Sequence, residues 1–316
     1  MADTAAATSP IAKRQRGSDE AASPKPEMPS KYVAITEDAH FQDISTDVLV
    51  ESNVFDVTKH YIHSLADIHG KYEEFMVYGD AAKTQTVSLV HFGEKLCGHT
   101  GIVHGGCIST VCDELFGWTM YWITGQVGFT AYLNVNFRKP LPTQTSGIIY
   151  TELDRREGRK VFMKSRVEDN DGTLDKAFGD DSLFNVEKHF IHSLRNIGGK
   201  YESFVVFGHV DKKSTTSFVH FGNSLCGHEG IVHGGCISTI CDELFGWTMV
   251  MDKAGFTANL NVNFRKPLPA QTLAIVVTEL ERIEGRKVYL KSTVKDAAGN
   301  VYTEATSLFI MPKPPQ

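Results

Sequence analysis

The stretch GHTGIVHGGCISTVCDELFGWTM at residues 98–120 returns almost unchanged as GHEGIVHGGCISTICDELFGWTM at residues 227–249. The similarity extends outward from this core, because residues 55–172 align with residues 184–299 with one small insertion near Gln126. A repeat of this length is far longer than a solenoid unit and has the size of a domain. The sequence therefore predicts two tandem domains, with any site present in both.

The repeat also divides the chain. We expect a first domain over residues 54–180 and a second over residues 181–316. Residues 1–30 are rich in Ala, Ser, Pro and mixed charge, which is typical of a disordered tail, and residues 31–53 form a lead-in with some apolar content.

The composition is that of a soluble globular protein, with 316 residues of which 41% are hydrophobic and 22% charged. The formal net charge of −6 argues against a nucleic-acid or anionic-membrane partner. No apolar run is long enough to span a bilayer, and the N-terminal residues match neither a secretory signal nor a mitochondrial presequence. We therefore expect a cytoplasmic protein.

The six cysteines occupy equivalent positions in the two copies, at Cys97, Cys107, Cys112, Cys226, Cys236 and Cys241. None belongs to a Cys-x-x-Cys pair, so a zinc site or a redox motif is not expected. We predict buried, reduced thiols and no disulfide framework.

Both copies show the same order of elements. Apolar residues recur at helical spacing from the paired glycines to about Trp122, which predicts one long, largely buried helix. Residues 129–138 then alternate apolar and polar side chains, which predicts a strand with one buried face. Further strands are predicted around the turns at Gly158 and Gly285, and residues 57–68 and 186–197 have the apolar spacing of a helical face. This order indicates an α+β domain whose antiparallel sheet wraps around the helix.

The two copies differ in two places. The second copy ends in a clear strand, VYTEATSLFIM at residues 301–311, whereas its counterpart at residues 173–184 has lost the strand pattern. The first copy also has a longer loop at Gly125-Gln126-Val127 between its helix and the next strand. We therefore expect two related sites rather than two identical ones.

Two polar features of the repeated segment indicate chemistry. The glycines after His104 allow a close approach to the backbone at a helix start, where free amides carry partial positive charge. Such a helix start can polarise a carbonyl group and stabilise an oxyanion, although the same glycines could simply form a tight turn. Asp113 and Asp242 lie mid-helix among apolar residues, where a carboxylate is costly unless it is paired or functional. A buried salt bridge is the structural alternative.

The combination of HGG-x6-D, TAxLNVNFRKP, EGRK and EATSLF resembles the PaaI-type hotdog-fold acyl-CoA thioesterases. The resemblance covers most of each repeat and implies a curved antiparallel sheet wrapped around a central helix. It also implies that two such units pair edge to edge, so that the tandem chain is a fused dimer. The implied activity is hydrolysis of acyl-CoA to a free acid and coenzyme A, without a metal or redox cofactor. Two such chains are expected to pair as a homodimer.

The resemblance also implies a role for each motif residue. Asp113 and Asp242 would activate water or act as nucleophiles, and Thr130 and Thr257 would hold the attacking water. Gly106 and Gly235 would stabilise the oxyanion, next to Gly105 and Gly234, while His104 and His233 would orient the thioester or the water. For the threonines and the histidines, strand propensity and loop packing are the alternatives.

In this family the glycine loop of one unit faces the aspartate of the other. One site would thus combine His104, Gly105 and Gly106 with Asp242 and Thr257, and the other His233, Gly234 and Gly235 with Asp113 and Thr130. Coenzyme A phosphates would find their counter-charges among Arg138, Lys139, Arg159, Lys160, Arg265, Lys266, Arg286 and Lys287, for which solvated strand ends are the alternative.

Three other functions fit parts of the sequence. A non-catalytic acyl-CoA binder or sensor could use the same scaffold, but the intact Asp and Thr in both copies count against it. A purely structural protein does not explain the duplicated polar motif. A hotdog dehydratase fits the spacing of the motif less well than a hydrolase does.

Overall fold

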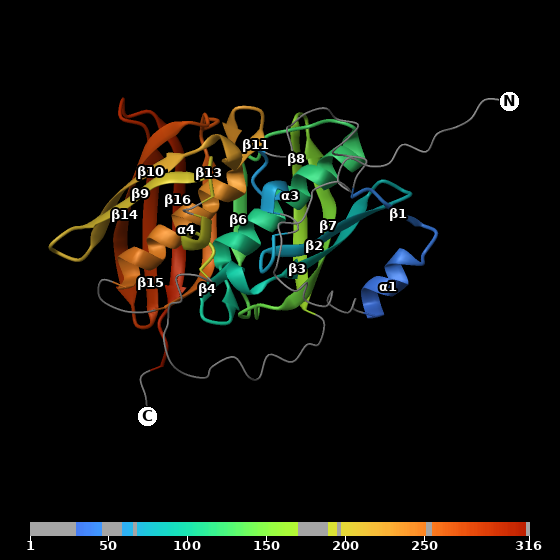
Figure 1. Ribbon diagram of the computed structural model, residues 1–316, viewed down its shortest axis with the longest axis horizontal. Coiled ribbons are helices and arrows are strands. Elements are labelled where there is room, and N and C mark those ends of the chain that lie inside the picture. The colour runs from blue at the N-terminus through green and yellow to red at the C-terminus, as the bar shows by residue number, and fades with distance from the viewer. Residues whose placement is uncertain are drawn as a thin grey trace.

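The computed structural model describes residues 30–45, 59–65, 68–169, 189–194, 197–250 and 255–313. Each repeat contributes one long helix, α3 (Gly105–Thr124) in the first and α4 (Gly234–Val250) in the second. Antiparallel strands lie behind these helices on either side of the molecule (Figure 1). The apolar residues that recur at helical spacing, such as Cys107, Val111 and Leu115, are buried. This is the predicted hotdog arrangement in two copies, and the α+β class is confirmed.

The second repeat supplies six strands of a seven-stranded sheet whose order is β6-β13-β16-β15-β14-β10-β9. These strands are β9 (Tyr201–Gly208), β10 (Ser214–Phe221), β13 (Phe256–Phe264), β14 (Thr272–Glu284), β15 (Lys287–Lys295) and β16 (Val301–Ile310). The clear final strand predicted for the second copy is confirmed as β16. The seventh strand, β6 (Tyr132–Asn136), comes from the first repeat.

The first repeat forms a five-stranded sheet of order β1-β2-β3-β7-β8. Its strands are β1 (Phe41–Asp43), β2 (Tyr72–Asp80), β3 (Gln85–Phe92), β7 (Thr145–Glu157) and β8 (Lys160–Asp169), preceded by the short helix α1 (Ser30–Thr36). The altered segment at residues 173–184 and the N-terminal tail up to residue 29 lie outside the described residues.

Short elements precede the first long strand of each repeat, β2 or β9, and the long helix. They are the strands β4 (Cys97–His99), β5 (Ile102–Val103), β11 (Cys226–His228) and β12 (Ile231–Val232), with the 3-10 turns η2 (His63–Leu65), η3 (Glu94–Leu96), η4 (His192–Leu194) and η5 (Asn223–Leu225). All six cysteines are buried, as predicted. Among the described helices, none combines the length and the apolarity needed to cross a membrane.

The two repeats meet about a pseudo-twofold axis. Strands β6 and β13 pair antiparallel with Asn134 opposite Asn261, and these two residues hold equivalent positions in the sequences FTAYLNVNF and FTANLNVNF. The same symmetry places the hydroxyls of Thr110 and Thr239 2.8 Å apart between α3 and α4. The edge-to-edge pairing implied by the resemblance is therefore present within one chain.

The second glycine of each HGG motif brings the two helices together. A Cβ atom on Gly106 would lie 2.5 Å from Cα of Thr239, and one on Gly235 would lie 2.5 Å from Cα of Thr110. Both contacts are with backbone, which cannot move aside as a flexible side chain can. These two positions accept only glycine while the helices keep their present separation.

The helices expected from the apolar spacing at residues 57–68 and 186–197 are not formed in the described residues. The chain there makes only the turns η2 and η4. Backbone contacts with the opposite repeat explain the difference, because the Tyr61 amide donates to the Cys226 carbonyl at 2.9 Å and the Phe190 amide donates to the Cys97 carbonyl at 2.9 Å. The apolar side chains of Tyr61 and Phe190 are nevertheless buried in the core that both repeats share.

Candidate functional site

The start of each long helix faces an aspartate from the other repeat. The Gly106 amide at the start of α3 donates to Oδ2 of Asp242 in α4 at 2.8 Å. The equivalent amide of Gly235 donates to Oδ2 of Asp113 at 2.7 Å. A Cβ atom on Gly105 would lie 2.9 Å from Asp242 Oδ2, so the first glycine makes room for the carboxylate. The start of each long helix thus lies against the aspartate of the other repeat.

Asp242 lies in a buried, hydrogen-bonded position. Its side chain is 5% exposed, and its Oδ1 accepts a hydrogen bond from Thr257 Oγ1 at 2.9 Å. Burial raises the pKa of Asp242 above its usual value, against the opposing effects of His104, Thr257 and the Gly106 amide. A carboxylate with a raised pKa is a stronger base, which suits it to accept a proton from water.

In the part of the chain that the structure describes, Asp113 has fewer hydrogen-bond partners than Asp242. Oδ1 of Asp113 has no hydrogen-bond partner among the residues that the structure describes, although Thr130 lines the same cavity. Thr130 precedes β6, whereas its counterpart Thr257 lies within β13. The longer loop of the first repeat reaches across to the second, because the Gly128 carbonyl accepts from His228 Nε2 at 3.2 Å. The expected difference between the two sites is therefore present at the aspartates themselves.

A buried glutamate follows each aspartate in the sequence and contacts histidines from both repeats. Oε2 of Glu243 lies 3.0 Å from His104 Nε2 and 3.4 Å from His189 Nε2. Oε1 lies 3.4 Å from His192 Nε2 and accepts from Trp247 Nε1 at 2.8 Å. We call Glu243, His104, His189 and His192 the Glu243 cluster.

The first repeat has the matching cluster around Glu114. Its Oε1 lies 2.8 Å from His63 Nε2, and its Oε2 lies 2.9 Å from His233 Nε2 and 3.5 Å from His60 Nε2. The Trp118 indole donates to Oε1 at 2.7 Å. Both clusters therefore have the same construction.

Sequence reasoning missed these clusters. Glu114 and Glu243 follow the aspartates directly in the sequence, and their side chains point about 100° around the helix from them. A signal was present, because the segments HYIHSL at residues 60–65 and HFIHSL at residues 189–194 repeat the same pair of histidines in both copies. Sequence alone does not show that each pair meets a glutamate of the long helix.

The surroundings shift the pKa values of three side chains in the Glu243 cluster, namely Glu243, His189 and His104. Although burial disfavours its ionised form, the hydrogen bonds from His104 and His192 hold the pKa of Glu243 well below its usual range. Burial lowers the pKa of His189 to about 3, so this ring is neutral near pH 7. Burial also disfavours charge on His104, but the bond to Glu243 and the charge of Asp242 outweigh it and raise its pKa. Of these two rings, His104 is therefore the one that more readily takes a second proton.

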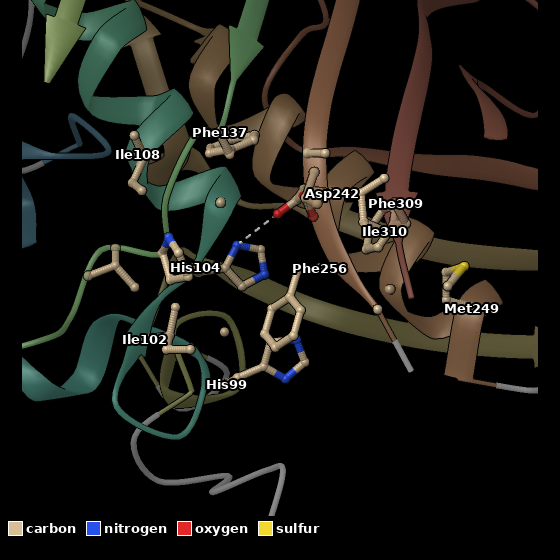
Figure 2. A pocket seen from close by; sticks show the side chains of 18 of the residues that line it. His99, Ile102, His104, Ile108, Phe137, Asp242, Met249, Phe256, Phe309 and Ile310 are labelled. Carbon is tan, nitrogen blue, oxygen red and sulfur yellow. Dashed lines mark hydrogen bonds and ion pairs between the residues drawn. The ribbon is translucent and has the colours of Figure 1, made fainter. Parts of the chain in front are cut away.

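A cavity of about 660 Å³ opens at Asp242. Figure 2 shows His104 and Asp242 facing each other, and the contact between His104 Nδ1 and Asp242 Oδ2 measures 3.3 Å. Apolar side chains surround this pair, namely Ile102, Ile108, Phe137, Met249, Phe256, Phe309 and Ile310. The cavity at Asp113 is smaller, at about 240 Å³. The first cavity can therefore hold an apolar group next to a carboxylate and a histidine.

The basic residues expected to face phosphates are divided between the two cavities. Arg138, Lys139 and Arg286 line the cavity at Asp242, and Arg265 and Lys266 line the cavity at Asp113. Arg159, Lys160 and Lys287 line neither cavity among the described residues. Arg265 forms an ion pair with Glu304, which reduces its availability for a ligand.

The ligand atoms of two residue groups also lie close enough to hold a metal ion. These groups are His60, Glu114 and His233, and His104, His189 and Glu243, whose donor atoms lie within 4.8 Å of one another in each group. The sequence had led us to expect no metal. The protonation of the histidines decides between a metal site and a hydrogen-bonded cluster.

One family model matches both repeats. The family model of the Thioesterase superfamily matches residues 100–176 and 229–303. Acyl-coenzyme A thioesterase THEM4 of Xenopus laevis is 32% identical over 157 residues, which cover 49% of this chain and 70% of that protein. THEM4 of Mus musculus is 34% identical over 139 residues, which cover 43% of this chain and 59% of that protein.

The chain spans 59% of the length of the mouse and rat relatives and 45% of the bovine one. Among solved structures, a putative thioesterase from Novosphingobium aromaticivorans is similar over 74% of this chain and 98% of that one, with 10% identity and a TM-score of 0.46. The match to the family model in both repeats and the similarity to the Xenopus protein show that this chain belongs to the thioesterase superfamily.

Proposed function

We propose that the chain hydrolyses acyl-CoA thioesters to a free acid and coenzyme A, chiefly at the site that contains Asp242. One observation carries this proposal: a buried carboxylate, held by the Gly106 amide and by the Thr257 hydroxyl, lies at an apolar cavity of about 660 Å³. The names of the relatives, acyl-coenzyme A thioesterases, support the choice of substrate class.

The proposed reaction begins with water held between Asp242 and Thr257. The carboxylate accepts a proton as the water attacks the thioester carbonyl, and its raised pKa makes it an effective base. Negative charge then develops on the carbonyl oxygen. If that oxygen lies at the start of α3, the partial positive charge of the first helical amides, with the Gly106 amide closest to Asp242, stabilises it.

The surroundings of Asp242 suit the two ends of an acyl-CoA. The side chains of Phe137, Phe256 and Phe309 form apolar walls for an acyl group. Arg138 and Arg286 at the same cavity can pair with the phosphates of coenzyme A. No metal or redox cofactor is required for the reaction as we propose it.

Thiol release from a series of acyl-CoAs tests the proposal. We expect the purified chain to release free thiol, and the Asp113→Asn, Asp242→Asn double variant to lose this activity by about 10²–10⁴-fold, the usual contribution of a general base. Isothermal titration calorimetry should still detect binding of acyl-CoA to the same double variant. Saturable binding of acyl-CoA by the unmodified chain without thiol release would instead identify a non-catalytic binder.

A further inference from the structure

The Glu243 cluster contains a second side chain, besides Asp242, that can transfer a proton in the proposed reaction. On the basis of the proposed function, we propose that Glu243, held by His189 and His192, keeps His104 as the acid that protonates the departing coenzyme A sulfur. Glu243, His189 and His192 are positioning residues in this account. His104 is the group that meets the leaving thiolate.

The geometry of His104 carries the proposal. Its ring bridges two carboxylates, with Nε2 3.0 Å from Glu243 Oε2 and Nδ1 3.3 Å from Asp242 Oδ2. His104 also lines the cavity in which the thioester would bind. A proton on Nδ1 therefore lies both at the cavity and next to the base.

Hydrogen bonds determine where the protons of the ring lie. Glu243 accepts from the Trp247 indole, and the Nε2 atoms of His104, His189 and His192 lie 3.0–3.4 Å from its oxygens, which is the setting of an ionised carboxylate. A neutral His104 then keeps its proton on Nε2, directed at Glu243, while Nδ1 accepts from the Gly106 amide at 2.9 Å. The same amide also donates to Asp242 Oδ2, so Nδ1 can gain a proton without leaving the amide unbonded.

The same bonds argue against a metal ion in this cluster. Zinc requires a lone pair on the ligating nitrogen, at about 2.0–2.1 Å. Because Nδ1 of His104 accepts an amide hydrogen, the proton of a neutral ring occupies Nε2, which is the atom that would have to bind the metal. We therefore interpret the cluster as a hydrogen-bonded one.

The titratable groups that face His104 come from two directions. Helix α4 contributes the carboxylates of Asp242 and Glu243, which both favour the charged ring. The segment at residues 189–194 contributes His189, whose ring centroid lies 5.5 Å away and which is neutral near pH 7. His99 of β4 contributes to lowering the pKa of His189. The two carboxylates therefore dominate, and His104 can carry a positive charge in a buried position.

Water, Asp242 and His104 supply and accept every proton that the proposed reaction needs. Water gives one proton to Asp242 and its hydroxyl to the thioester carbon. When the tetrahedral intermediate collapses, the carbon–sulfur bond breaks and the sulfur takes the Nδ1 proton of His104. Asp242 then returns its proton to Nδ1 across the 3.3 Å contact. The products are the acid and the thiol, and both protein groups return to their starting states.

The substitution Glu243→Gln tests the proposal, because it keeps the shape of the side chain and removes its charge. An acid is active only while it is protonated, so activity is lost as the pH rises through the pKa of His104. Loss of the carboxylate charge lowers that pKa, and the alkaline limb of the kcat profile should move to lower pH. At pH 8 we expect turnover of an acyl-CoA to fall by about 10²-fold, within the range for a general acid.

The leaving group provides the internal control. An aryl thioester of the same acid, such as a 5-thio-2-nitrobenzoate ester, releases an acidic thiol that needs no proton, so Glu243→Gln should change its turnover by less than about threefold relative to the unmodified protein. If Glu243→Gln lowers the turnover of both esters equally and the alkaline limb of the kcat profile does not move, the inference is overturned. The proposed thioesterase function would still stand. If the unmodified protein cleaved neither ester, the proposed function and this inference would fall together.

A measurement on the unmodified protein does not depend on how the variant folds. With an acid in place, kcat/KM should vary little across a series of thioesters of rising thiol pKa. A steep decline across that series would show that the sulfur leaves unprotonated and would overturn the inference.

Discussion

Thr257 Oγ1 donates a hydrogen bond to Oδ1 of Asp242 across 2.9 Å. The equivalent oxygen of Asp113 has no such partner among the described residues, although Thr130 occupies the matching place in the sequence. Asp242 thus accepts from two donors, the Gly106 amide and the Thr257 hydroxyl, whereas Asp113 accepts from the Gly235 amide. This difference leads us to assign most of the turnover to Asp242.

The threonines provide the first test of that assignment. A hydrogen bond to a charged group contributes about 1.5–3 kcal/mol, which corresponds to roughly ten- to hundredfold in rate. We expect Thr257→Val to lower kcat for thiol release by that factor, because the isosteric side chain cannot donate to Asp242. Thr130→Val serves as the matched control and should keep more than about half of the activity. Equal losses in the two variants would show that the sites work equally.

The helix contact at Gly106 predicts a loss of stability. Gly106→Ala places a methyl group 2.5 Å from the backbone of Thr239, so α3 and α4 must separate. Overpacking of this kind typically costs about 1–3 kcal/mol, which urea unfolding would measure.

Gly117 offers a control in the same helix. A Cβ atom there meets nothing within 4 Å, so Gly117→Ala should stabilise the protein by up to about 1 kcal/mol through helix propensity. If both alanine variants unfold at the same urea concentration, the contact between the helix starts does not limit stability.

Two buried lysines predict a rise of stability with pH. Lys71 donates to the carbonyls of Lys95 and Phe190 and to Ser193, and burial lowers its pKa to about 7. Burial lowers the pKa of Lys200 to about 8. Between these values and the usual lysine pKa of about 10.4, the unfolded chain binds protons that the folded chain has released. The free energy of unfolding therefore increases with pH in this window, by up to about 1.4 kcal/mol per pH unit for each lysine.

The Lys71→Met variant isolates this effect. We expect the pH dependence of its unfolding free energy between pH 7 and 9.5 to be shallower than that of the unmodified protein, because one of the two lysines is absent. Urea unfolding at several pH values measures both curves. Parallel curves would mean that Lys71 stays charged in the folded protein.

Local patterns in the sequence predicted most of the fold. The apolar spacing after the paired glycines predicted α3 and α4, and the strand pattern at residues 301–311 predicted β16, because both patterns follow from the element's own geometry. The spacing at residues 57–68 failed as a helix signal, since Tyr61 and its neighbours bond to the other repeat instead of to their own turn.

The site could be predicted only in part. The crosswise pairing of Gly106 with Asp242 came from a resemblance to a family and not from the spacing of the residues. The Glu243 cluster needs His104 and Glu243, 139 residues apart in the sequence, to meet across the pseudo-twofold axis. The missing partner of Asp113 Oδ1 depends on the path of a loop, which composition does not determine.

In the proposed reaction, each site takes its aspartate from one repeat and its histidine from the other. Thiol release by four single variants, Asp242→Asn, His104→Gln, Asp113→Asn and His233→Gln, tests it most directly. The crosswise account predicts that the Asp242 and His104 variants lose activity together, by about 10²-fold or more, while the Asp113 and His233 variants keep most of it. A large joint loss in the Asp242 and His233 variants, with His104→Gln still active, would show that each site is built within one repeat or in another combination.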